Sequence, residues 1–480
     1  MNTPALLLAA PELLVLVMAC VIMVVGVFVS RERRGIIQVL SMLTLVFAAI
    51  ITMRGDYLAS GARFGTAFHD SFIRDPMGDV LKVFSYAILT LVYIYSKHYL
   101  HVFRLFRTDF YTLTLFALLG VMLLISANSL VTIYLGLELI SLSSYALVAF
   151  DRDSRRGSEA AMKYFVLGSM ASGMLLYGMS MVYGATGSLQ LQTIATQVGS
   201  GNHEIMLVFG LVFLVAGIAF KLGAAPFHMW LPDVYHGAPA AVTLFISTVP
   251  KLAAFAMLVR LLTSGMGALH ADWQQMLVLL SVLSIVIGNL AAIMQSNIKR
   301  MLAFSTVSHM GFVLLGLLPG TAYGLGASMF YIIVYALMSA AGFGMVILLS
   351  GQGVEAENLE DFRGLNQRNS WYALVMMMVM FSMAGVPVFV GFFAKWLVIK
   401  AVLDAGMTWL AILAVVFSVI GSFYYLRVVK LMYFDEPKIE TPVSVPVDFG
   451  TAISFNGILM LGLGMFSSSL IAVCMASFGL

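Results

Sequence analysis

Six ionisable side chains lie inside long apolar stretches of this sequence, where a passively packed helix would carry leucine. They are Glu138, Lys163, Lys221, Lys251, Lys395 and Lys400. A charge at the centre of a membrane helix costs about 2.5–3.5 kcal/mol on insertion scales, so such residues indicate a path for protons or ions. Lys400 is the exception, because it comes near a helix end and is expected to extend to the surface.

Two of these lysines stand beside predicted breaks in apolar helices. Lys221 opens the stretch KLGAAPFHMWLPDVYHGAP, and Lys395 follows GVP in the second stretch. Proline removes a backbone N–H and clashes with the carbonyl one turn earlier. A broken membrane helix is tolerated only where protein or water surrounds the freed backbone groups. The breaking residues are Gly223 and Pro226 in the first stretch and Gly385 and Pro387 in the second.

Lys251 directly follows Pro250. The proline predicts a kink that frees the carbonyl of Ile246 and forms a local polar pocket around the amine. Glu138 lies in a span that also carries Ser141, Ser143 and Ser144, whose hydroxyls favour hydrogen bonds or water near the carboxylate.

Three further residues have two open interpretations. Lys163 follows Glu159 by four positions, so it either forms a helical ion pair or takes part in the path. His228 and His309 can relay protons near neutral pH, but a histidine inside a helix is often only hydrogen bonded. Because Lys163, Lys221, Lys251 and Lys395 face a single mid-membrane glutamate, we expect at least one of them to exchange its proton near neutral pH. Asp79 and Lys82, one turn apart, are expected to form a structural pair.

Composition limits the class of protein. The chain is 61% hydrophobic and 10% charged, with a mean hydropathy of +0.99, which indicates a polytopic α-helical membrane protein. Cys20 and Cys474 lie at opposite ends in apolar runs, which favours neither an iron–sulfur site nor a disulfide framework. The net charge of +3 calls for no nucleic-acid partner. Arginines follow the apolar run 5–29 rather than precede it, so this run is expected to be a first span and not a cleaved signal peptide.

The apolar runs predict about fourteen membrane-spanning helices. Their approximate ranges are 5–29, 35–53, 77–96, 110–126, 129–150, 159–184, 204–235 (broken), 239–262, 273–294, 300–318, 322–350, 370–403 (broken), 407–433 and 452–478.

Basic residues gather in every second loop of this count, which predicts a cytoplasmic location for those loops and an outside, periplasmic N-terminus. These residues are Arg31, Arg33, Arg34, Lys97, Arg104, Arg107, Arg152, Arg155, Arg156, Lys299, Arg300, Arg363, Arg368, Lys430 and Lys438. The other loops carry little beyond Arg54, Arg63 and Arg74.

A faint internal repeat relates spans four to eight to spans nine to thirteen. YFVLGSMA from Tyr164 resembles YIIVYALM from Tyr331, and the two predicted breaks occur at a similar offset. Units of five helices must be inverted relative to each other, and matched breaks in inverted halves are typical of transporters. The expected organisation is a three-helix segment (1–108), two inverted repeats (109–265 and 266–435) and a last helix (436–480).

Several motifs resemble those of the antiporter-like subunits of respiratory complex I, over essentially the whole chain. They are KLGAAPFHMWLPDVYHGAP, LGLELISLSSYAL around Glu138, SNIKRMLAFSTVSHMG from Ser296 and GVPVFVGFFAKW from Gly385. The PDVYxGAP form is typical of the subunit N branch. Subunit M has a glutamate where this chain has Lys395, and subunit L has a C-terminal extension for which no residues remain after the last span.

The resemblance implies proton translocation driven by quinone reduction in other subunits. Glu138 and Lys221 are similar to a pair that opens and closes, Lys251 to a central relay and Lys395 to a terminal lysine. Lys163 and His228 resemble accessory positions on the input side. No cofactor or metal is expected in this chain, whereas NADH, FMN, iron–sulfur clusters and quinone are expected in partner subunits. The implied partners are subunit M, the small subunits toward the quinone site and the lipids of a bacterial inner membrane.

Three other functions remain open. The chain could belong to a multisubunit cation/proton antiporter, to the membrane arm of an energy-converting hydrogenase, or to a scaffold that only joins neighbouring subunits. Co-purification with iron–sulfur and flavin subunits separates the complex I interpretation from the antiporter. Loss of pumping on substitution of Lys221 in an intact assembly excludes the scaffold.

Overall fold

The computed structural model describes residues 3–30, 33–54, 64–200, 205–351, 354–437, 443 and 445–480, so Arg31, Arg63 and Lys438 of the loop-charge prediction lie outside the described residues. The first half contains α1 (Thr3–Leu8), α2 (Ala10–Phe28), α3 (Gly35–Met53), β1 (Gly65–Ala67), β2 (Phe72–Arg74), α4 (Pro76–Val102), α5 (Thr108–Ile125), α6 (Leu130–Val148), α7 (Arg155–Thr186), α8 (Leu191–Gly199), α9 (Ile205–Leu222), α10 (Trp230–Gly237), α11 (Ala240–Ile246), α12 (Val249–Val259) and the π-helix η3 (Arg260–Gly265).

The second half contains η4 (Gly267–Leu269), α13 (His270–Ile293), α14 (Ile298–Leu317), α15 (Ala322–Leu349), η5 (Leu359–Phe362), α16 (Leu365–Arg368), α17 (Ser370–Ala384), α18 (Val390–Asp404), α19 (Thr408–Phe434), α20 (Val447–Met465) and α21 (Ser467–Ala476).

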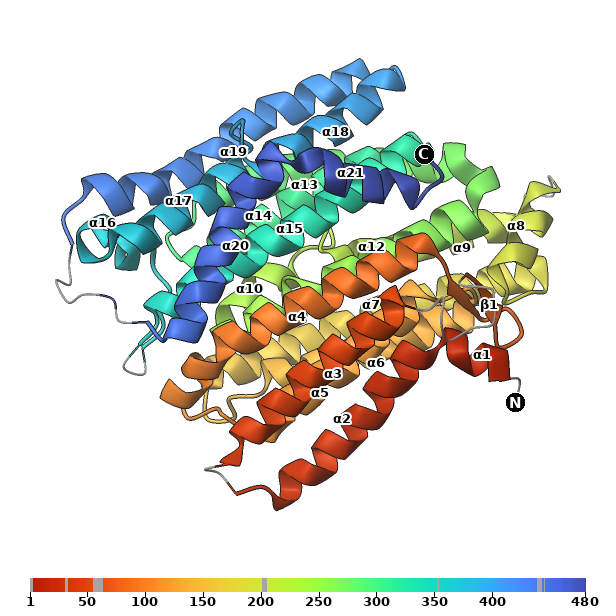
Figure 1. The fold of residues 1–480 in the computed structure, drawn as a ribbon. Coiled ribbons are helices and arrows are strands. Elements are labelled where there is room, and N and C mark those ends of the chain that lie inside the picture. The colour runs from red at the N-terminus through yellow and green to blue at the C-terminus, as the bar shows by residue number, and fades with distance from the viewer. Residues whose placement is uncertain are drawn as a thin grey trace.

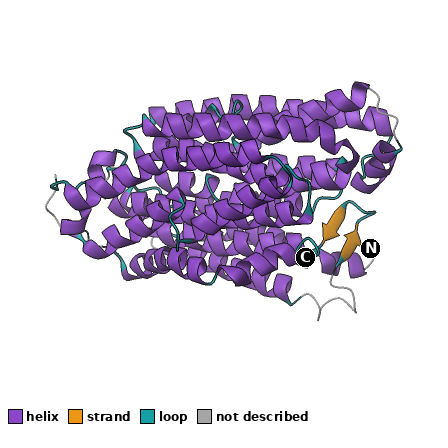
Figure 2. Cartoon of the chain, turned by 90° about the horizontal axis from the view of Figure 1, so that it is seen from above, coloured by secondary structure: helices purple, strands orange, loops and turns teal. Residues whose placement is uncertain are grey.

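The long helices run side by side as one bundle (Figure 1). The chain progresses across it from α2 and α3 at one edge to α18 and α19 at the other, and α20 crosses back over α15. The only described strands form a small hairpin at one end of the bundle (Figure 2), where Thr66 pairs with Ile73. The all-α membrane fold is therefore confirmed, with this hairpin as a minor addition.

Thirteen helical segments in the described part of the chain are long and apolar enough to span a membrane. They match thirteen of the fourteen predicted spans. The remaining predicted span, 370–403, is divided into α17 and α18, each only 15 residues long. The predicted break at Gly385 and Pro387 is the reason, because α17 ends at Ala384 and α18 begins at Val390.

Polar residues begin several helices and satisfy their first backbone N–H groups. The backbone N–H three residues later donates a hydrogen bond to the side chain of each of Asp75, Ser129, Ser154, Asn297, Thr321 and Asn369. Such N-caps each stabilise a helix by about 1 kcal/mol. They fix where α4, α6, α7, α14, α15 and α17 start, and with that the depth of every polar side chain on those helices.

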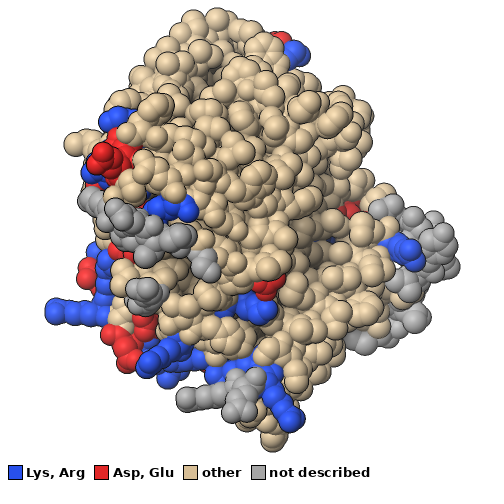
Figure 3. Space-filling view, turned by 60° about the vertical axis from the view of Figure 1, so that its left-hand side comes forward, with Lys and Arg blue, Asp and Glu red and all other residues tan. Residues whose placement is uncertain are grey.

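Burial divides the helices into a centre and a rim. The most apolar 18-residue windows of α15 and of the α11–α12 segment are 94% buried, against 28% for α2 and 33% for α19. Most of the face shown in Figure 3 is free of charge, and Lys and Arg gather at one end. The rim residues present an apolar surface suited to lipid, whereas polar residues such as Lys251 on α12 and His309 on α14 are enclosed by protein.

One local prediction was wrong. Lys82 does not pair with Asp79: its amine bonds Glu12 at 2.5 Å, while Arg74 pairs with Asp79 at 3.1 Å. The break expected at Pro250 is present, because α11 stops at Ile246 and α12 restarts at Val249. Among the described hydrogen bonds, the amine of Lys251 bonds carbonyls at the end of α9 and not that of Ile246.

Candidate functional site

The break after α9 exposes backbone groups that side chains from other helices satisfy. Gly223 ends the helix in a left-handed conformation (φ +79°), and a Cβ there would lie 1.9 Å from a methyl carbon of Leu231. The indole N–H of Trp230 donates to the carbonyl of Phe220 at 3.0 Å, and the N–H of Ala225 donates to Ser284 at 2.8 Å. Glycine is thus required for this turn, and the break predicted from Gly223 and Pro226 is present.

Lys251 completes the same break. Its Nζ donates to the carbonyl of Leu222 at 2.8 Å and to that of Lys221 at 3.3 Å. The amine also lies 5.2 Å from the centre of the Trp230 ring. Because the C-terminal end of a helix carries a partial negative charge, the end of α9 is a favourable place for a buried cation.

Lys221 lies on the last turn of α9 and points toward α6 and α7. Its Nζ donates to the hydroxyl of Ser141 at 2.9 Å and to that of Ser172 at 3.2 Å. Glu138 lies one turn before Ser141 and is close enough for its charge to act on Lys221. Among the described ion pairs none joins the two, and one oxygen of Glu138 is buried without a hydrogen-bond partner. The pair is therefore present in a separated arrangement, with Ser141 bonded to the amine.

A cavity of about 30 Å³ connects the first two lysines. Its lining includes Lys221, Lys251, Ser141, Tyr164 and Trp230. A site that holds one water needs roughly 10–15 Å³ on this measure and at least two polar partners. The space between the amines is therefore large enough for a water to bridge them.

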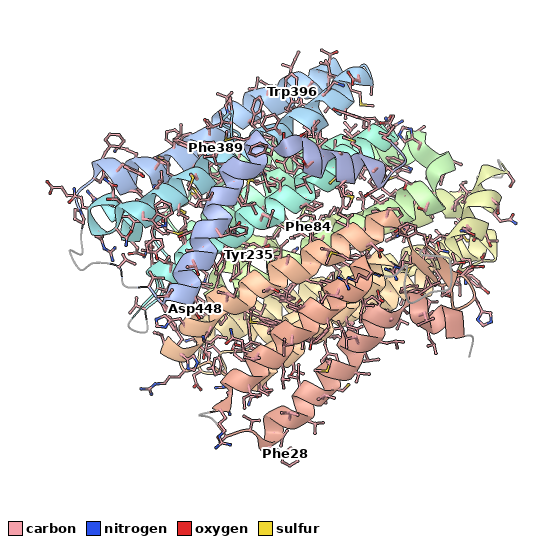
Figure 4. All side chains as sticks on the ribbon, viewed as in Figure 1. Phe28, Phe84, Tyr235, Phe389, Trp396 and Asp448 are labelled. Carbon is pink, nitrogen blue, oxygen red and sulfur yellow. The ribbon has the colours of Figure 1, made fainter. Side chains whose placement is uncertain are left out.

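Lys395 repeats this arrangement at the second break. Gly385 ends α17 with φ +86°, and the Nζ of Lys395 donates to the carbonyl of Ala384 at 2.8 Å and to Ser418 at 2.9 Å. The side chain thus folds back from α18 onto the end of the preceding half-helix. In Figure 4 its neighbour Trp396 lies at the outer edge of the bundle, and it is 55% exposed. Of these two neighbours, Lys395 faces the interior and Trp396 faces outward.

His309 lies at the centre of a hydrogen-bonded chain. Its Nδ1 lies 2.8 Å from the hydroxyl of Tyr331, and its Nε2 lies 3.0 Å from that of Tyr425. Tyr425 also contacts Ser305 at 2.5 Å. Both ring nitrogens therefore have partners that accept or donate a proton, and Lys395 is near enough for its charge to act on the histidine.

Tyrosines occupy the region between the two groups of lysines. Tyr335 donates to Thr306 at 2.8 Å, one turn before His309 on α14. Tyr235, labelled near the middle of the bundle in Figure 4, lies 6.3 Å from Trp230, ring centre to ring centre. Its hydroxyl is buried and has no hydrogen-bond partner among the described residues. The region between Trp230 and His309 therefore holds polar side chains, but no described hydrogen bond joins Tyr235 to either end.

The remaining predicted residues lie apart from this line. The side chain of Lys163 is 44% exposed and pairs with Glu159 and with Asp233, each at 2.9 Å. The expected helical ion pair is thus present. Lys400 is exposed and pairs with Asp404. His228 is buried, with its Nδ1 free of hydrogen bonds, and its ring lies 6.1 Å from that of Phe304.

The chain is similar to known proteins over almost its whole length. The family model described as NADH:quinone oxidoreductase/Mrp antiporter, TM, matches residues 127–421. The NADH-quinone oxidoreductase subunit N of Thioalkalivibrio sulfidiphilus is 55% identical over 467 residues, 96% of each chain. That of Thiobacillus denitrificans is 53% identical over 484 residues, 100% of this chain and 99% of the relative. The chain belongs to the NADH-quinone oxidoreductase subunit N family.

Solved structures extend the comparison. A chain in respiratory complex I from Thermus thermophilus with bound aureothin has a TM-score of 0.82 and 30% identity, over 96% of this chain and 98% of that chain. The Mrp complex from Dietzia sp. DQ12-45-1b gives a TM-score of 0.86 at 20% identity, over 100% and 97% of the two chains. At that identity the likeness concerns the fold alone.

In this member of the subunit N family the sequence reasoning missed two groups of polar residues. The first group is the tyrosines Tyr235, Tyr331, Tyr335 and Tyr425. The second joins the loop after α15 to the ends of other helices. There Lys299, which is fully buried, bonds Glu355 and the carbonyl of Ala238, each at 2.8 Å. The second group could have been predicted, because Lys299 and Glu355 lie close to loops that are rich in charge. The tyrosines could not, because a buried tyrosine in a sequence is usually an ordinary core residue.

Glu357 shows how strongly this loop is held. Partial burial acts to raise the pKa of its carboxyl group. The hydrogen bond from His236, the charge of Lys299 and the guanidinium of Arg156 outweigh that effect and lower the pKa to about 2. The imidazole Nε2 and the carboxylate are 3.5 Å apart. Four helix ends, those of α7, α10, α14 and α15, thus meet at one loop.

Glu357→Gln is expected to destabilise the chain, with a pH dependence of known sign. Because the folded-state pKa is about 2 and the ordinary value is 4.5, the carboxylate adds stability above pH 4.5, and this is lost as the pH falls toward 2. Thermal unfolding in detergent should therefore show a gap between wild type and variant at neutral pH that narrows in this range. Glu360→Gln, at a carboxylate 47% exposed, is the control and should change little. A gap independent of pH would contradict this account.

Proposed function

We propose that this chain moves protons across a bacterial inner membrane as the N subunit of a proton-pumping NADH:quinone oxidoreductase. The single observation that carries the proposal is the set of buried amines at helix breaks: Lys251 at the end of α9 and Lys395 at the end of α17. Membership of the subunit N family supplies the context, since its named members are subunits of that oxidoreductase. The redox reaction belongs to other subunits, which would hold NADH, FMN, iron–sulfur clusters and quinone.

In the proposed route the proton passes along the amines in order. Approach of Glu138 stabilises the charged amine of Lys221, and separation favours release of its proton across the cavity to Lys251. Tyr235, Tyr335 and His309 continue the line toward Lys395. The hydroxyls and the imidazole can each accept one proton and donate another, so net transfer needs no large displacement.

The energies involved are of the right size. Moving one proton against about 100 mV requires about 2.3 kcal/mol. Two unit charges about 4 Å apart interact with about 4 kcal/mol at an effective dielectric constant of about 20. Opening or closing the Glu138–Lys221 pair therefore changes the interaction energy by an amount comparable to that needed to move one proton, and the redox reaction in other subunits would drive the change.

The proposal extends to four further assignments. Lys163 and His228 would serve the input side, because Lys163 is exposed and lies beside Asp233. The two halves, 109–265 and 266–435, would be inverted repeats, each with one broken helix. Subunit M and the small subunits toward the quinone site would be the neighbours, with lipid covering the rim. The basic loops favour a periplasmic N-terminus.

Removing the three central amines should abolish pumping while the complex still assembles. Lys221→Ala, Lys251→Ala and Lys395→Ala are each expected to lower proton translocation at least about tenfold, the scale of a lost acid–base group. The measurement is acidification of proteoliposomes that contain the whole complex, with NADH oxidation by an artificial acceptor as the assembly check. Lys400→Ala, at a side chain 46% exposed, is the matched control and should pump normally. Full pumping by all three variants would refute the route.

The tyrosine chain gives an independent test. Tyr425→Phe removes the hydroxyl that joins Ser305 to His309, so proton translocation should fall below wild type. Tyr93→Phe removes a hydroxyl equally buried on α4, bonded to Thr114 at 2.9 Å, and should leave pumping unchanged. Equal rates for the two variants would show that Tyr425 lies outside the route.

The proposed orientation predicts opposite labelling of two loops. In a chain with Cys20→Ala and Cys474→Ala, a cysteine at exposed Gln192 should react with an impermeant maleimide on intact cells. A cysteine at exposed Asp153 should react only in inverted vesicles. The reverse labelling pattern would show that the N-terminus lies in the cytoplasm.

A further inference from the structure

A pocket of about 470 Å³ opens at the arginine-rich end of the bundle, between α2, α5 and α6. It lies outside the lysine line described above. Its polar wall contains Arg34, Arg107 and Arg152, and its apolar wall contains Val27, Leu113 and Phe116. A second hollow of about 570 Å³ shares Arg34 and Arg107 and adds Arg104. The two hollows together form one basic recess beside an apolar groove.

The arginines of this recess form no ion pair with any described residue. None of the described ion pairs involves Arg34, Arg107 or Arg152, although the chain forms many others, such as Arg260 with Asp75 at 2.6 Å. Asp109 is the single acidic residue in the lining. Unpaired guanidinium groups gathered around one hollow produce a positive potential that favours an anion with several oxygens.

Local geometry holds donors in place around the recess. The Nη1 of Arg34 donates to the carbonyl of Phe106 at 2.9 Å, while its Nε is buried without a partner. The hydroxyl of Thr108 is also buried and unpartnered, and α5 begins there without a side-chain cap. Unbonded donors at the start of an 18-residue helix add to the attraction for an anion.

The apolar groove identifies the occupant. Val27 and Phe28 on α2 are 78% and 82% exposed, so this part of α2 faces the hydrocarbon side of the bundle. Phe28 marks the end of α2 in Figure 4. A free phosphate would use the arginines but not the groove. Only an amphipathic anion uses both, with its head at the arginines and its chains along α2 and α5.

We propose that this recess binds the headgroup of an anionic phospholipid, with an acyl chain lying in the groove between α2 and α5. Arg34, Arg107 and Arg152 bind the phosphate oxygens, and the donors at the start of α5 complete the site. The site is independent of proton transfer, so it stands or falls separately from the proposed function.

The test uses the full chain in nanodiscs of equal phosphatidylglycerol and phosphatidylcholine, followed by native mass spectrometry of the lipids that stay bound. Wild type is expected to retain phosphatidylglycerol selectively. Each neutralised arginine should weaken this binding by about fivefold. The variant Arg34→Gln/Arg107→Gln/Arg152→Gln should therefore lose the bound lipid.

A matched control removes the same charge elsewhere at the same end of the bundle: Lys97→Gln/Arg155→Gln/Lys430→Gln should retain the lipid. Val27→Trp, which fills the groove and leaves every arginine in place, should also lose it, and covers the case in which the triple variant fails to fold. Equal retention by the arginine variant and its control would overturn the proposal. Displacement of the lipid by inorganic phosphate would also overturn it, because the anion alone would then be recognised.

Discussion

A helix that stops inside the membrane leaves carbonyl groups that lipid cannot satisfy, and this constraint organises the protein. At both breaks the donor is a lysine amine: Lys251 bonds the end of α9, and Lys395 bonds the end of α17. Each unsatisfied group would cost several kcal/mol in hydrocarbon. The amine satisfies a carbonyl freed by the break, and that carbonyl gives the buried amine a hydrogen-bond acceptor. The same titratable groups therefore also stabilise the fold.

Burial of the central helices makes this arrangement possible. α12, α14 and α15 are enclosed by other helices, so their polar side chains meet each other and not lipid. His309 has partners at both ring nitrogens, and Lys221 is held by two serines. The rim helices contribute fewer of these groups, although α19 supplies Ser418 to Lys395 and Tyr425 to His309. They separate the centre of the bundle from the hydrocarbon, and at the arginine-rich end they form the recess beside α2.

The sequence alone predicts the helix breaks and the buried lysines. It does not predict the partners of these side chains, because they depend on tertiary structure. The breaks at Pro226 and Pro387 and the inward lysines were predictable, because proline acts locally and a buried charge is costly wherever it points. The partners of Lys251 and Lys82 were not, because they lie on other helices: Leu222 in one case and Glu12 in the other. Tyr331 and Tyr425 were missed because only packing decides whether a buried hydroxyl meets a histidine.

The partners of Lys251 have a consequence for how the protein tolerates change. The acceptors are main-chain oxygens of residues 221 and 222, which exist whatever side chain stands at either position. No point substitution at residue 222 deletes them, whereas a shift in the course of the main chain does. The hydrogen bonds of this amine thus depend on the course of the main chain and not on the side chains at residues 221 and 222.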